Sequence, residues 1–295
     1  MIWIIGNNGM LGKELTILFD NCNISYIGTD KEIDITDIAV LQKFSNTQLQ
    51  TGKDIQWIIN CAAYTNVDRA EDEKELCYKV NVIGSENIAK TANELGAKLI
   101  YISTDYVFDG NNNSAYSEED TTSPLSVYGK TKLEGEMQIM ENNQKSIILR
   151  TAWLYGQHGK NFVFTMINLM RAKDEISVIS DCWGSPTWTK NLAEAVFTII
   201  MKDVPAYGIY NASGEGKANW YEFAKEIYEN AYEKGIIDKR VEIIPINANE
   251  YPAKAVRPKN SLLDKTKFKN KFNFAFPDWK ESLNVFFNDI KHFSF

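Results

Sequence analysis

The start of the chain constrains the fold most strongly, because a glycine-rich loop directly follows its first apolar run. Residues 2–5 read IWII, residues 6–12 read GNNGMLG, and a helical pattern extends from about residue 10 to residue 19. Glycines at such a turn let the backbone approach a pyrophosphate closely, and the helix that follows offers its first N–H groups to the same anion. A purely structural turn would also use glycines, but the position between strand and helix favours a dinucleotide site.

The first half of the chain alternates between short apolar runs and helical patterns. We predict strands over residues 2–5, 24–28, 57–60, 99–102 and 146–150, and helices over residues 10–19, 38–44, 75–95 and 128–140. Nearly continuous apolar strands separated by helices are typical of a parallel sheet that helices cover on both faces. Right-handed crossovers then give an α/β fold with a doubly wound parallel sheet.

The second half of the chain is less regular and predicts a smaller α/β lobe for the substrate. We expect helices over residues 162–171, 192–201, 221–233 and 277–287, and one more strand over residues 207–210. No long linker or repeat separates the two halves. We therefore assign residues 1–155, with returning segments at about 185–215, to the dinucleotide-binding domain, and residues 156–295 mainly to the substrate-binding lobe.

Composition excludes several classes of function. The chain has 295 residues, a formal net charge of −7 and a pI of about 5.1, which argues against a nucleic-acid partner. No apolar run approaches the length of about 18 residues that spans a bilayer, and the N-terminus lacks the features of a signal peptide. The four cysteines form no CxxC pair. We therefore expect free thiols in a reducing cytoplasm and no membrane partner.

The cofactor site is expected at the ends of the first three strands. The glycine loop contributes Gly6, Asn8, Gly9, Met10, Leu11 and Gly12, and the end of the third strand contributes Cys61, Ala62, Ala63 and Tyr64. Small residues at a strand's end let a cofactor lie against the backbone. Asp30 ends the second strand, where a carboxylate accepts hydrogen bonds from a ribose and disfavours a 2′-phosphate. Lys31 follows it and would pair with that phosphate, so the residues leave NADH and NADPH open.

A tyrosine and a lysine at helical spacing are the candidate catalytic pair. Tyr128 and Lys132 lie at positions i and i+4 of a predicted helix, so their side chains share one face. A nearby ammonium lowers the pKa of a phenol, which suits Tyr128 as a proton donor to a carbonyl oxygen that receives a hydride. Ser103 and Thr104 end the fourth strand opposite this helix. Their hydroxyls are expected to reach the carbonyl and the nicotinamide.

With these motifs in place, the chain resembles the extended short-chain dehydrogenases that act on nucleotide sugars, and within them the dTDP-4-dehydrorhamnose reductase family. The resemblance runs nearly end to end. It is carried by residues 6–12, 60–71, 81, 103–110, 123–136, 150–156, 184–187 and 257–261. One strand end separates this family from the related dehydratases: Tyr106 follows Asp105 where a dehydratase carries a Glu, so the resemblance favours reduction over loss of water.

The resemblance implies that NADPH or NADH passes a hydride to the 4-keto carbon of a dTDP-linked sugar. Thr104 would hydrogen-bond the carbonyl, Tyr128 would protonate it, and Lys132 would bind the nicotinamide ribose. The substrate would also meet Asp105, Tyr106, Trp153, which would pack on the sugar, and Arg257, which would meet the diphosphate or the base. Asn81 would belong to the cofactor site.

The resemblance leaves two features of the assembly open. Some members of the family use magnesium and a dimer interface, but carboxylates such as Glu14 and Glu194 form no oxygen-ligand cluster in the sequence. We therefore predict no metal site, with Mg²⁺ possible in principle, and a monomer or a homodimer.

Two other functions are compatible with the same scaffold. A nucleotide-sugar epimerase or dehydratase would keep its nicotinamide bound through turnover, whereas a reductase would release it. A non-catalytic regulatory subunit would keep the cofactor fold without the chemistry, and loss of the tyrosine or the lysine would mark it. Tyr128 and Lys132 are both present, which favours an enzyme.

Overall fold

The apolar runs of the first half form a parallel sheet, which one strand from the second half extends. The computed structural model describes residues 1–203 and 205–290. In spatial order the six strands are β10 (Gly208–Asn211), β5 (Ser146–Thr151), β4 (Lys98–Thr104), β3 (Trp57–Asn60), β1 (Ile2–Ile5) and β2 (Tyr26–Thr29). The predicted doubly wound parallel sheet is confirmed. The bounds of β1 and β3 are as predicted, and the ends of the other four strands differ from their predicted positions by at most two residues.

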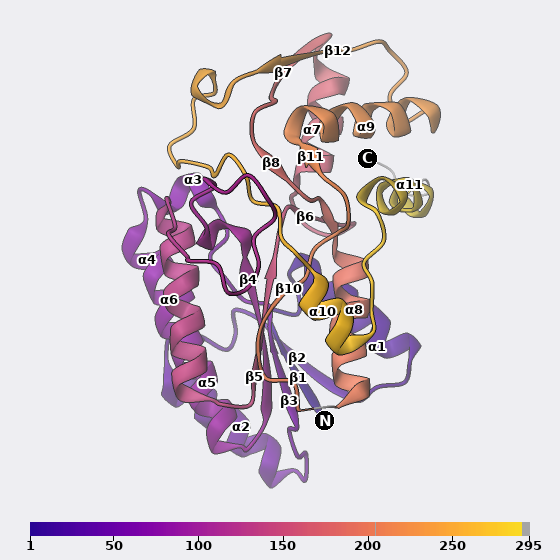
Figure 1. Ribbon diagram of the computed structural model, residues 1–295. Helices are drawn as coiled ribbons and strands as arrows, with labels where there is room; N and C mark the ends of the chain where they lie inside the picture. Colours follow the sequence, from indigo (N-terminus) through magenta and orange to yellow (C-terminus); the bar gives the residue numbers. More distant parts are fainter. Residues whose placement is uncertain (204, 291–295) are drawn as a thin grey trace.

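Helices cover both faces of the sheet, as Figure 1 shows. One face carries α1 (Met10–Asn21), α8 (Thr189–Lys202) and α10 (Thr266–Phe272), and the other carries α2 (Ile38–Gln50), α5 (Gly84–Glu94) and α6 (Val127–Asn142). Successive strand residues point to opposite faces. Ile2 and Ile4 therefore pack in the first of these two cores, and Trp3 and Ile5 pack in the second. This double burial explains why the strands are apolar throughout.

The helix predicted over residues 75–95 is not uniform. It consists of α4 (Lys74–Tyr78), a π-helical turn η1 (Lys79–Ile83) and α5. Such turns occur mostly as short interruptions of α-helices, frequently at functional sites. The turn contains the buried Asn81, whose side chain bonds the backbone of Tyr64. The sequence pattern did not predict this interruption, because one extra residue in a turn hardly changes the hydrophobic period.

Later segments build the lobe above the carboxyl ends of the strands. Its helices are α7 (Phe162–Ala172), α9 (Trp220–Glu233) and α11 (Trp279–Asp289), and its paired strands are β7 (Glu175–Ile179) with β12 (Glu242–Ile246), β8 (Trp183–Gly184) with β11 (Ala218–Asn219), and β6 (Leu154–Tyr155) with β9 (Thr187–Trp188). Three short helices complete the described elements: α3 (Val67–Ala70), η2 (Asp105–Val107) and η3 (Ala248–Glu250). An aromatic core that includes Tyr155, Phe223 and Phe286 joins the lobe helices.

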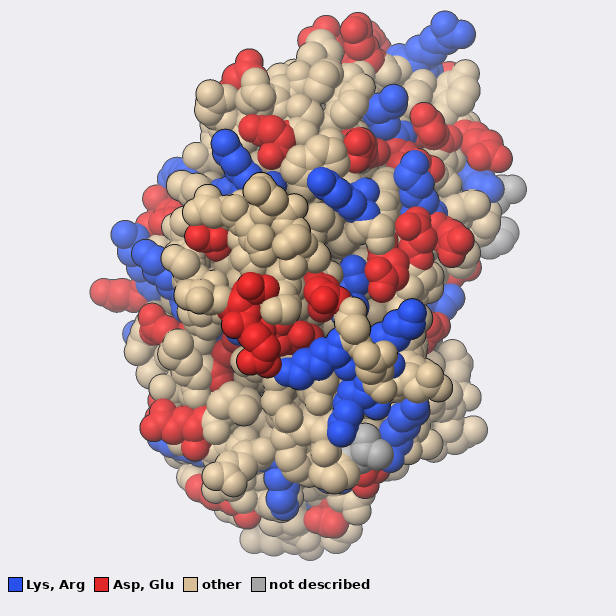
Figure 2. Space-filling view, in the orientation of Figure 1, with Lys and Arg blue, Asp and Glu red and all other residues tan. Residues whose placement is uncertain are grey.

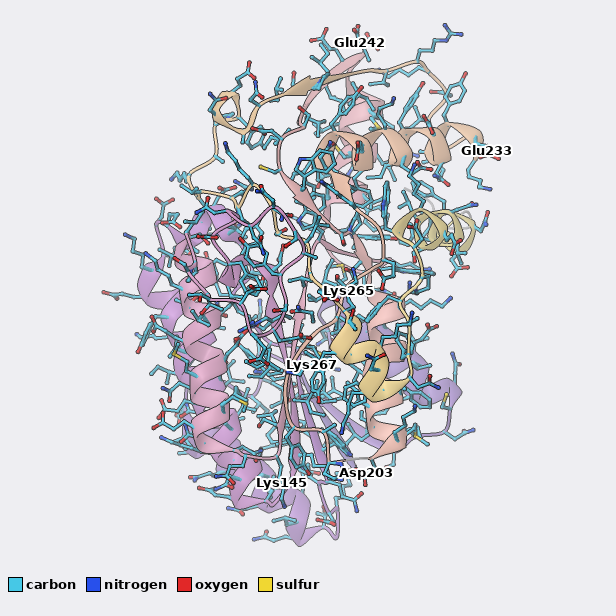
Figure 3. The ribbon with its side chains drawn as sticks, in the orientation of Figure 1. Lys145, Asp203, Glu233, Glu242, Lys265 and Lys267 are labelled. Carbon is cyan, nitrogen blue, oxygen red and sulfur yellow. The ribbon has the colours of Figure 1, made fainter. Side chains whose placement is uncertain are left out.

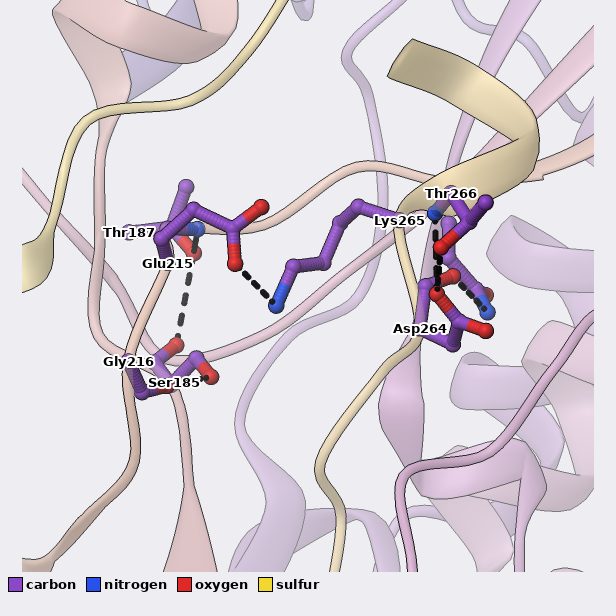
Figure 4. Close-up of polar contacts among 9 residues, drawn as sticks. Ser185, Thr187, Glu215, Gly216, Asp264, Lys265 and Thr266 are labelled. Carbon is purple, nitrogen blue, oxygen red and sulfur yellow. Dashed lines mark hydrogen bonds and ion pairs between the residues drawn. The ribbon is translucent and has the colours of Figure 1, made fainter. Parts of the chain in front are cut away.

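Polar contacts connect segments of the second half that lie far apart in the sequence (Figure 4). The Lys265 Nζ lies 3.2 Å from a carboxylate oxygen of Glu215, and the Ser185 hydroxyl donates to the carbonyl oxygen of Gly216 at 2.7 Å. Figure 3 places Lys265 midway between Glu242 at the far end of the lobe and Asp203 at the opposite end of the sheet. These contacts therefore lie where the lobe meets the sheet.

The outer surface carries charges of both signs. Figure 2 shows acidic and basic side chains over the face in view, with several basic side chains gathered at its lower right, next to a group of acidic ones. Within residues 1–203 and 205–290, no helix combines the length and the apolar character needed to cross a membrane.

Candidate active site

The carboxyl ends of β1, β3, β4 and β5 meet at one edge of the sheet. After β1 the chain continues to β2 on one side, whereas β3 lies on the other side of β1. Ligands of such sheets bind where the strand order reverses, outside the carboxyl ends of the strands. The glycine loop after β1 and the segment after β3 lie at this point, so the topology itself places a binding crevice there.

A cavity of about 760 Å³ occupies this crevice. Among its lining residues are most of the predicted cofactor residues, namely Gly6, Asn8, Gly9, Asp30, Lys31, Cys61, Ala62, Ala63 and Tyr64. Gly6 has a φ of 80°, and a Cβ at this position would lie 2.8 Å from the backbone nitrogen of Ala62. Only glycine fits this turn, which brings the two loops together beneath the space for a dinucleotide.

The N-terminus of α1 faces the same crevice. Gly9 is its N-cap and contributes no side chain to the first N–H groups, and Met10 and Leu11 line the adjoining part of the crevice. An uncapped helix N-terminus beside a glycine turn suits a pyrophosphate. Gly12 lies behind the loop instead, because a Cβ there would be 2.2 Å from the Gly6 carbonyl oxygen.

Asn81 supports the crevice from behind and does not line it. Its side-chain oxygen accepts a hydrogen bond from the Tyr64 N–H at 2.8 Å, and its amide nitrogen donates to the Tyr64 carbonyl and to the Thr131 hydroxyl. Thr131 belongs to α6, the helix that carries Tyr128 and Lys132. Asn81 therefore fixes the segment after β3 against α6.

A second cavity of about 470 Å³ continues from the first and shares Gly9, Cys61 and Ala63 with it. It brings together the glycine loop and most of the predicted catalytic and substrate residues, namely Met10, Leu11, Ser103, Thr104, Asp105, Tyr128, Lys132 and Trp153. The meeting of glycine loop, strand-end hydroxyl, phenol and lysine is thus present in one continuous crevice.

The start of α6 is fixed by two caps, which sets the place of Tyr128. The Ser126 hydroxyl accepts from the Gly129 N–H at 3.1 Å, and a Glu71 carboxylate oxygen accepts from the Val127 N–H at 2.8 Å. Both contacts satisfy N–H groups that the first turn of a helix leaves without partners. The phenol therefore projects from an anchored first turn.

Burial dominates the electrostatics at Tyr128. Desolvation raises the pKa of the Tyr128 phenol, while a hydrogen bond with the Thr104 side chain opposes that rise. We expected the ammonium of Lys132 to lower this pKa, and the structure gives the opposite direction. The reason is that the phenol is removed from water, which penalises the phenolate. Tyr128 is accordingly protonated in this state, as a proton donor must be.

Lys132 is also buried, at 2% exposure, and it faces the strand next to its helix. Its Nζ donates to the carbonyl oxygen of Ile102 at 2.6 Å and lies 4.0 Å from the centre of the Tyr101 ring. Burial lowers the pKa of Lys132 to about 7, and the carboxylate of Glu136 is the largest influence in the other direction. Lys132 therefore gains or loses its proton close to neutral pH.

Asp105 is a buried carboxyl beside the candidate proton donor. The Thr104 hydroxyl donates to one of its oxygens at 3.0 Å. Its other oxygen, Oδ2, has no hydrogen-bond partner among the described residues. Desolvation raises the pKa of Asp105 to about 7, and the nearby hydroxyls of Ser261 and Thr104 oppose that rise. In either protonation state, this carboxyl has an oxygen available for a hydrogen bond with a ligand hydroxyl.

Trp153 has an unusual backbone conformation at the rim of the crevice. Its φ is 47°, a value that a bulky side chain rarely adopts. Its ring stacks on Trp220 of α9, with ring centroids 3.5 Å apart and planes that differ by 10°. Such strained residues cluster at ligand sites, where surrounding contacts hold them in place.

Three residues predicted for the site are directed elsewhere. Ser103 lines the crevice, but its hydroxyl donates to Glu136. Tyr106 is buried behind Tyr128, with an edge-to-face ring contact at 6.0 Å. Arg257 lines a separate cavity of about 560 Å³. Its Nη2 lies 2.7 Å from an Asp68 carboxylate oxygen.

Sequence reasoning missed the loop that follows β6. Gly159 and Lys160 line the second cavity, where Lys160 adds a cation near the candidate site for the nicotinamide. A glycine–lysine pair in a polar loop shortly after a strand end was the available signal.

For metals, the residues that the structure describes contain no group of three or more His, Cys, Asp or Glu side chains able to hold an ion.

Known proteins share both the sequence and the fold of this chain. Residues 1–292 match the family described as RmlD substrate binding domain. A dTDP-4-dehydrorhamnose reductase of Aggregatibacter actinomycetemcomitans is 37% identical, with 95% of this chain and 96% of the relative covered.

Two solved structures agree with this relationship. A dTDP-4-dehydrorhamnose reductase, RfbD ortholog, of Clostridium acetobutylicum has 40% identity and a TM-score of 0.90, covering 98% of this chain and 99% of that chain. The dTDP-4-dehydrorhamnose reductase of Bacillus anthracis, solved in complex with NADP, has 38% identity and a TM-score of 0.89, covering 98% of each chain.

The doubly wound sheet, the glycine loop and the Tyr128–Lys132 helix together define an NAD(P)-dependent oxidoreductase of the short-chain dehydrogenase class. Among these enzymes, the chain belongs to the dTDP-4-dehydrorhamnose reductase family.

Proposed function

We propose that this protein reduces the 4-keto group of dTDP-4-dehydro-L-rhamnose to give dTDP-L-rhamnose, with NADPH or NADH as the reductant. The observation that carries the proposal is the single crevice in which Tyr128, Thr104 and Lys132 meet the glycine loop. A product of this kind serves the biosynthesis of cell-surface polysaccharide. We assign binding of the dinucleotide mainly to residues 1–155, with segments at about 185–215. We assign most substrate contacts to residues 156–295.

Reduced nicotinamide, when bound, supplies the hydride that adds to the 4-keto carbon. Tyr128 supplies the proton: its O–H bond breaks as the new O–H bond of the sugar hydroxyl forms, and the phenolate is left on Tyr128. In this structure the Thr104 hydroxyl donates to Asp105. With substrate bound it would turn to donate to the same carbonyl oxygen and stabilise the charge that develops there. The Lys132 ammonium stabilises the phenolate until a proton returns to it from water.

The geometry supports a protonated Tyr128 before the reaction. The phenol is buried, its pKa is raised, and Thr104 shares a hydrogen bond with it. A protonated phenol is the form needed for reduction, and a nearby ammonium becomes useful only when the phenolate forms. The arrangement therefore holds Tyr128 in the protonation state that reduction requires.

Most of the substrate and cofactor contacts that we assign involve residues that line the crevice, whereas Tyr106 and Arg257 lie outside its lining. We assign Trp153 to the sugar, since an aromatic ring packs well on a sugar face, and Asp105 to a sugar hydroxyl. Tyr106 is assigned to support the substrate through Tyr128, and Arg257 to the diphosphate, which it would reach by leaving Asp68. Asp30 and Lys31 are assigned to the adenosine ribose and to a 2′-phosphate on it.

The direct test is to incubate the purified protein with dTDP-4-dehydro-L-rhamnose and either NADPH or NADH. The proposal predicts loss of the reduced-nicotinamide absorbance and formation of dTDP-L-rhamnose, one product per cofactor oxidised. A protein purified with tightly bound NAD⁺ that interconverts nucleotide sugars without consuming cofactor would be an epimerase or dehydratase instead. A protein that binds NADPH without turning over would be a regulatory subunit.

We also place the protein in the cytoplasm, as a monomer or a homodimer. The four cysteines are free thiols in the structure, which agrees with a reducing compartment. Fractionation of cells, together with light scattering after size-exclusion chromatography, would test the two assignments separately.

A further inference from the structure

A buried ion pair lies beneath the catalytic helix, and the proposed reaction does not use it. Glu136 of α6 and Arg150 of β5 have side chains that are each only 3% exposed. The Arg150 Nη2 lies 2.7 Å from Glu136 Oε2, and its Nε lies 3.0 Å from Oε1. The Ser103 hydroxyl donates to the same carboxylate. A buried pair of this kind adds little stability on average, so its position needs another explanation.

The carboxylate is fixed next to the reactive groups. Glu136 follows Lys132 by four residues and Tyr128 by eight, so the three side chains occupy successive turns of one face of α6. Its partners are strand residues that lie directly opposite each other, because Ser103 of β4 pairs with Arg150 of β5. The next pair along the same strands is Thr104 with Thr151. Glu136 thus links the helix of Tyr128 to the strand position beside Thr104.

The groups around Lys132 leave Glu136 as its main counter-charge. From β4 it meets the Ile102 carbonyl and the Tyr101 ring, both uncharged. The Cys61 thiol after β3 has a pKa raised to about 12, and burial also raises the pKa of the Cys77 thiol on α4. Tyr128 on its own helix is protonated as well, as argued above. Burial therefore favours the neutral amine, and the Glu136 carboxylate is the ionised group that opposes it most.

We infer that Glu136 is a positioning residue for the proposed reduction: its buried carboxylate, held by Arg150 and Ser103, keeps Lys132 as an ammonium at the crevice. This inference rests on the proposed roles of Tyr128 and Lys132. Arg150 and Ser103 hold both carboxylate oxygens of Glu136 toward the strands β4 and β5. The ammonium then retains donors for the cofactor ribose and a charge for the phenolate that forms on Tyr128.

The test measures the titration of Lys132 directly, without cofactor or substrate. Lysines are labelled with ¹³C at Cε, and the Lys132 resonance is the one missing from the Lys132→Arg variant, whose arginine carries no such label. Its midpoint is then measured in wild type and in the Glu136→Gln variant. We expect the midpoint to fall by about one pH unit in Glu136→Gln, because a nearby opposite charge has been removed from a buried amine.

Two matched variants separate charge from packing. Glu136→Asp keeps the charge but shortens the side chain, and Ser103→Ala removes a hydrogen bond to Glu136 without changing any charge. In both variants, the Lys132 midpoint should differ from that of wild type by no more than about a third of the shift measured in Glu136→Gln. An unchanged midpoint in Glu136→Gln, or an equal fall in Glu136→Asp, overturns the inference, since the pair would then act only through packing.

Two further measurements keep the inference testable if a variant misfolds or if the proposed function is wrong. If Glu136→Gln does not fold, Glu136→Gln combined with Arg150→Gln removes both buried charges, and the Lys132 midpoint must still fall. In the reductase assay, the high-pH loss of kcat/KM should move to lower pH in the same variant. A midpoint shift in a protein that has no reductase activity would contradict the proposed function while leaving the Glu136–Lys132 coupling established.

Discussion

Trp153 lies flat on Trp220, with the two ring centroids 3.5 Å apart, although the two residues lie far apart in the sequence. The space for the Trp153 ring is provided by Gly184, where a Cβ would lie 2.5 Å from the ring atom Cε2. The orientation of Trp153 therefore depends on a glycine of β8 and an indole of α9 as well as on its own strained backbone.

Gly184→Ala should displace the Trp153 ring from the crevice. We expect the KM for the nucleotide sugar to rise by about tenfold, in line with about 1.4 kcal/mol of lost stacking, and the Kd for NADPH to stay the same. Steady-state kinetics and a fluorescence titration with NADPH measure the two quantities. Trp220→Phe, which keeps an aromatic ring under Trp153, serves as the milder control. A KM for Gly184→Ala equal to that of wild type would remove Trp153 from the sugar site.

The sequence predicted the sheet well because its signals are local. Residues 2–5 are apolar throughout because both faces of β1 are covered, and the GNNGMLG loop follows at once. The lobe was predicted less well, since β7 and β12 are short strands that pair across about 65 residues of chain. Nothing in either strand alone indicates its partner.

The same limit applies to the site. Tyr128, Lys132 and Thr104 were found because i,i+4 spacing and a strand end bring them together in any fold of this class. The contact of Arg257 with Asp68 spans 189 residues, so no local pattern predicts it. The direction of the Tyr128 pKa was also missed, because burial of a side chain depends on the whole packed structure.

Arg257 and Asp68 offer a test of the diphosphate assignment. Arg257→Ala should raise the KM for the nucleotide sugar by about tenfold or more, because a charged hydrogen-bonding partner of the diphosphate is lost. Asp68→Asn is the matched variant, since it removes the ion pair but leaves the guanidinium. It should lower that KM or leave it unchanged. If the two variants raise KM equally, Arg257 acts only by anchoring its segment to Asp68.

Lys31 should decide part of the cofactor preference. In the structure it lines the first cavity beside Asp30. Lys31→Ala should weaken the binding of NADPH by about fivefold, which corresponds to close to 1 kcal/mol for a partly exposed ion pair. The affinity for NADH should change little. Isothermal titration with each cofactor measures this directly, and Lys13→Ala on the neighbouring helix controls for a general loss of charge. An equal loss for both cofactors would place Lys31 away from the 2′-phosphate.

Asp105 should make stability depend on pH. Its pKa rises from a usual value of 3.8 to about 7 in the folded protein, so the folded state binds more protons than the unfolded state between these values. Its contribution to stability is therefore greatest at low pH and decreases as the pH rises from about 4 to about 7. Asp105→Asn has no carboxyl at this position, so this pH-dependent loss of stability should be absent from the variant.

Thermal unfolding of wild type and Asp105→Asn across that range provides the measurement. The variant should gain a few degrees in Tm relative to wild type at pH 8, given about 2–4 °C per kcal/mol for a chain of this size, and much less at pH 4. Other buried carboxyls are common to both proteins, so the difference between the two curves isolates Asp105. Parallel curves would mean that Asp105 is ionised at the same pH in both states.

Replacement of Tyr128 by phenylalanine tests the central claim most directly, because it removes one oxygen and leaves the crevice intact. With dTDP-4-dehydro-L-rhamnose and NADPH, we predict that Tyr128→Phe lowers kcat by about 10²- to 10⁴-fold, the usual contribution of a general acid, while the Kd for NADPH stays within about threefold of wild type. Equal kcat values for the variant and the wild type would contradict proton donation by Tyr128 and the mechanism built on it.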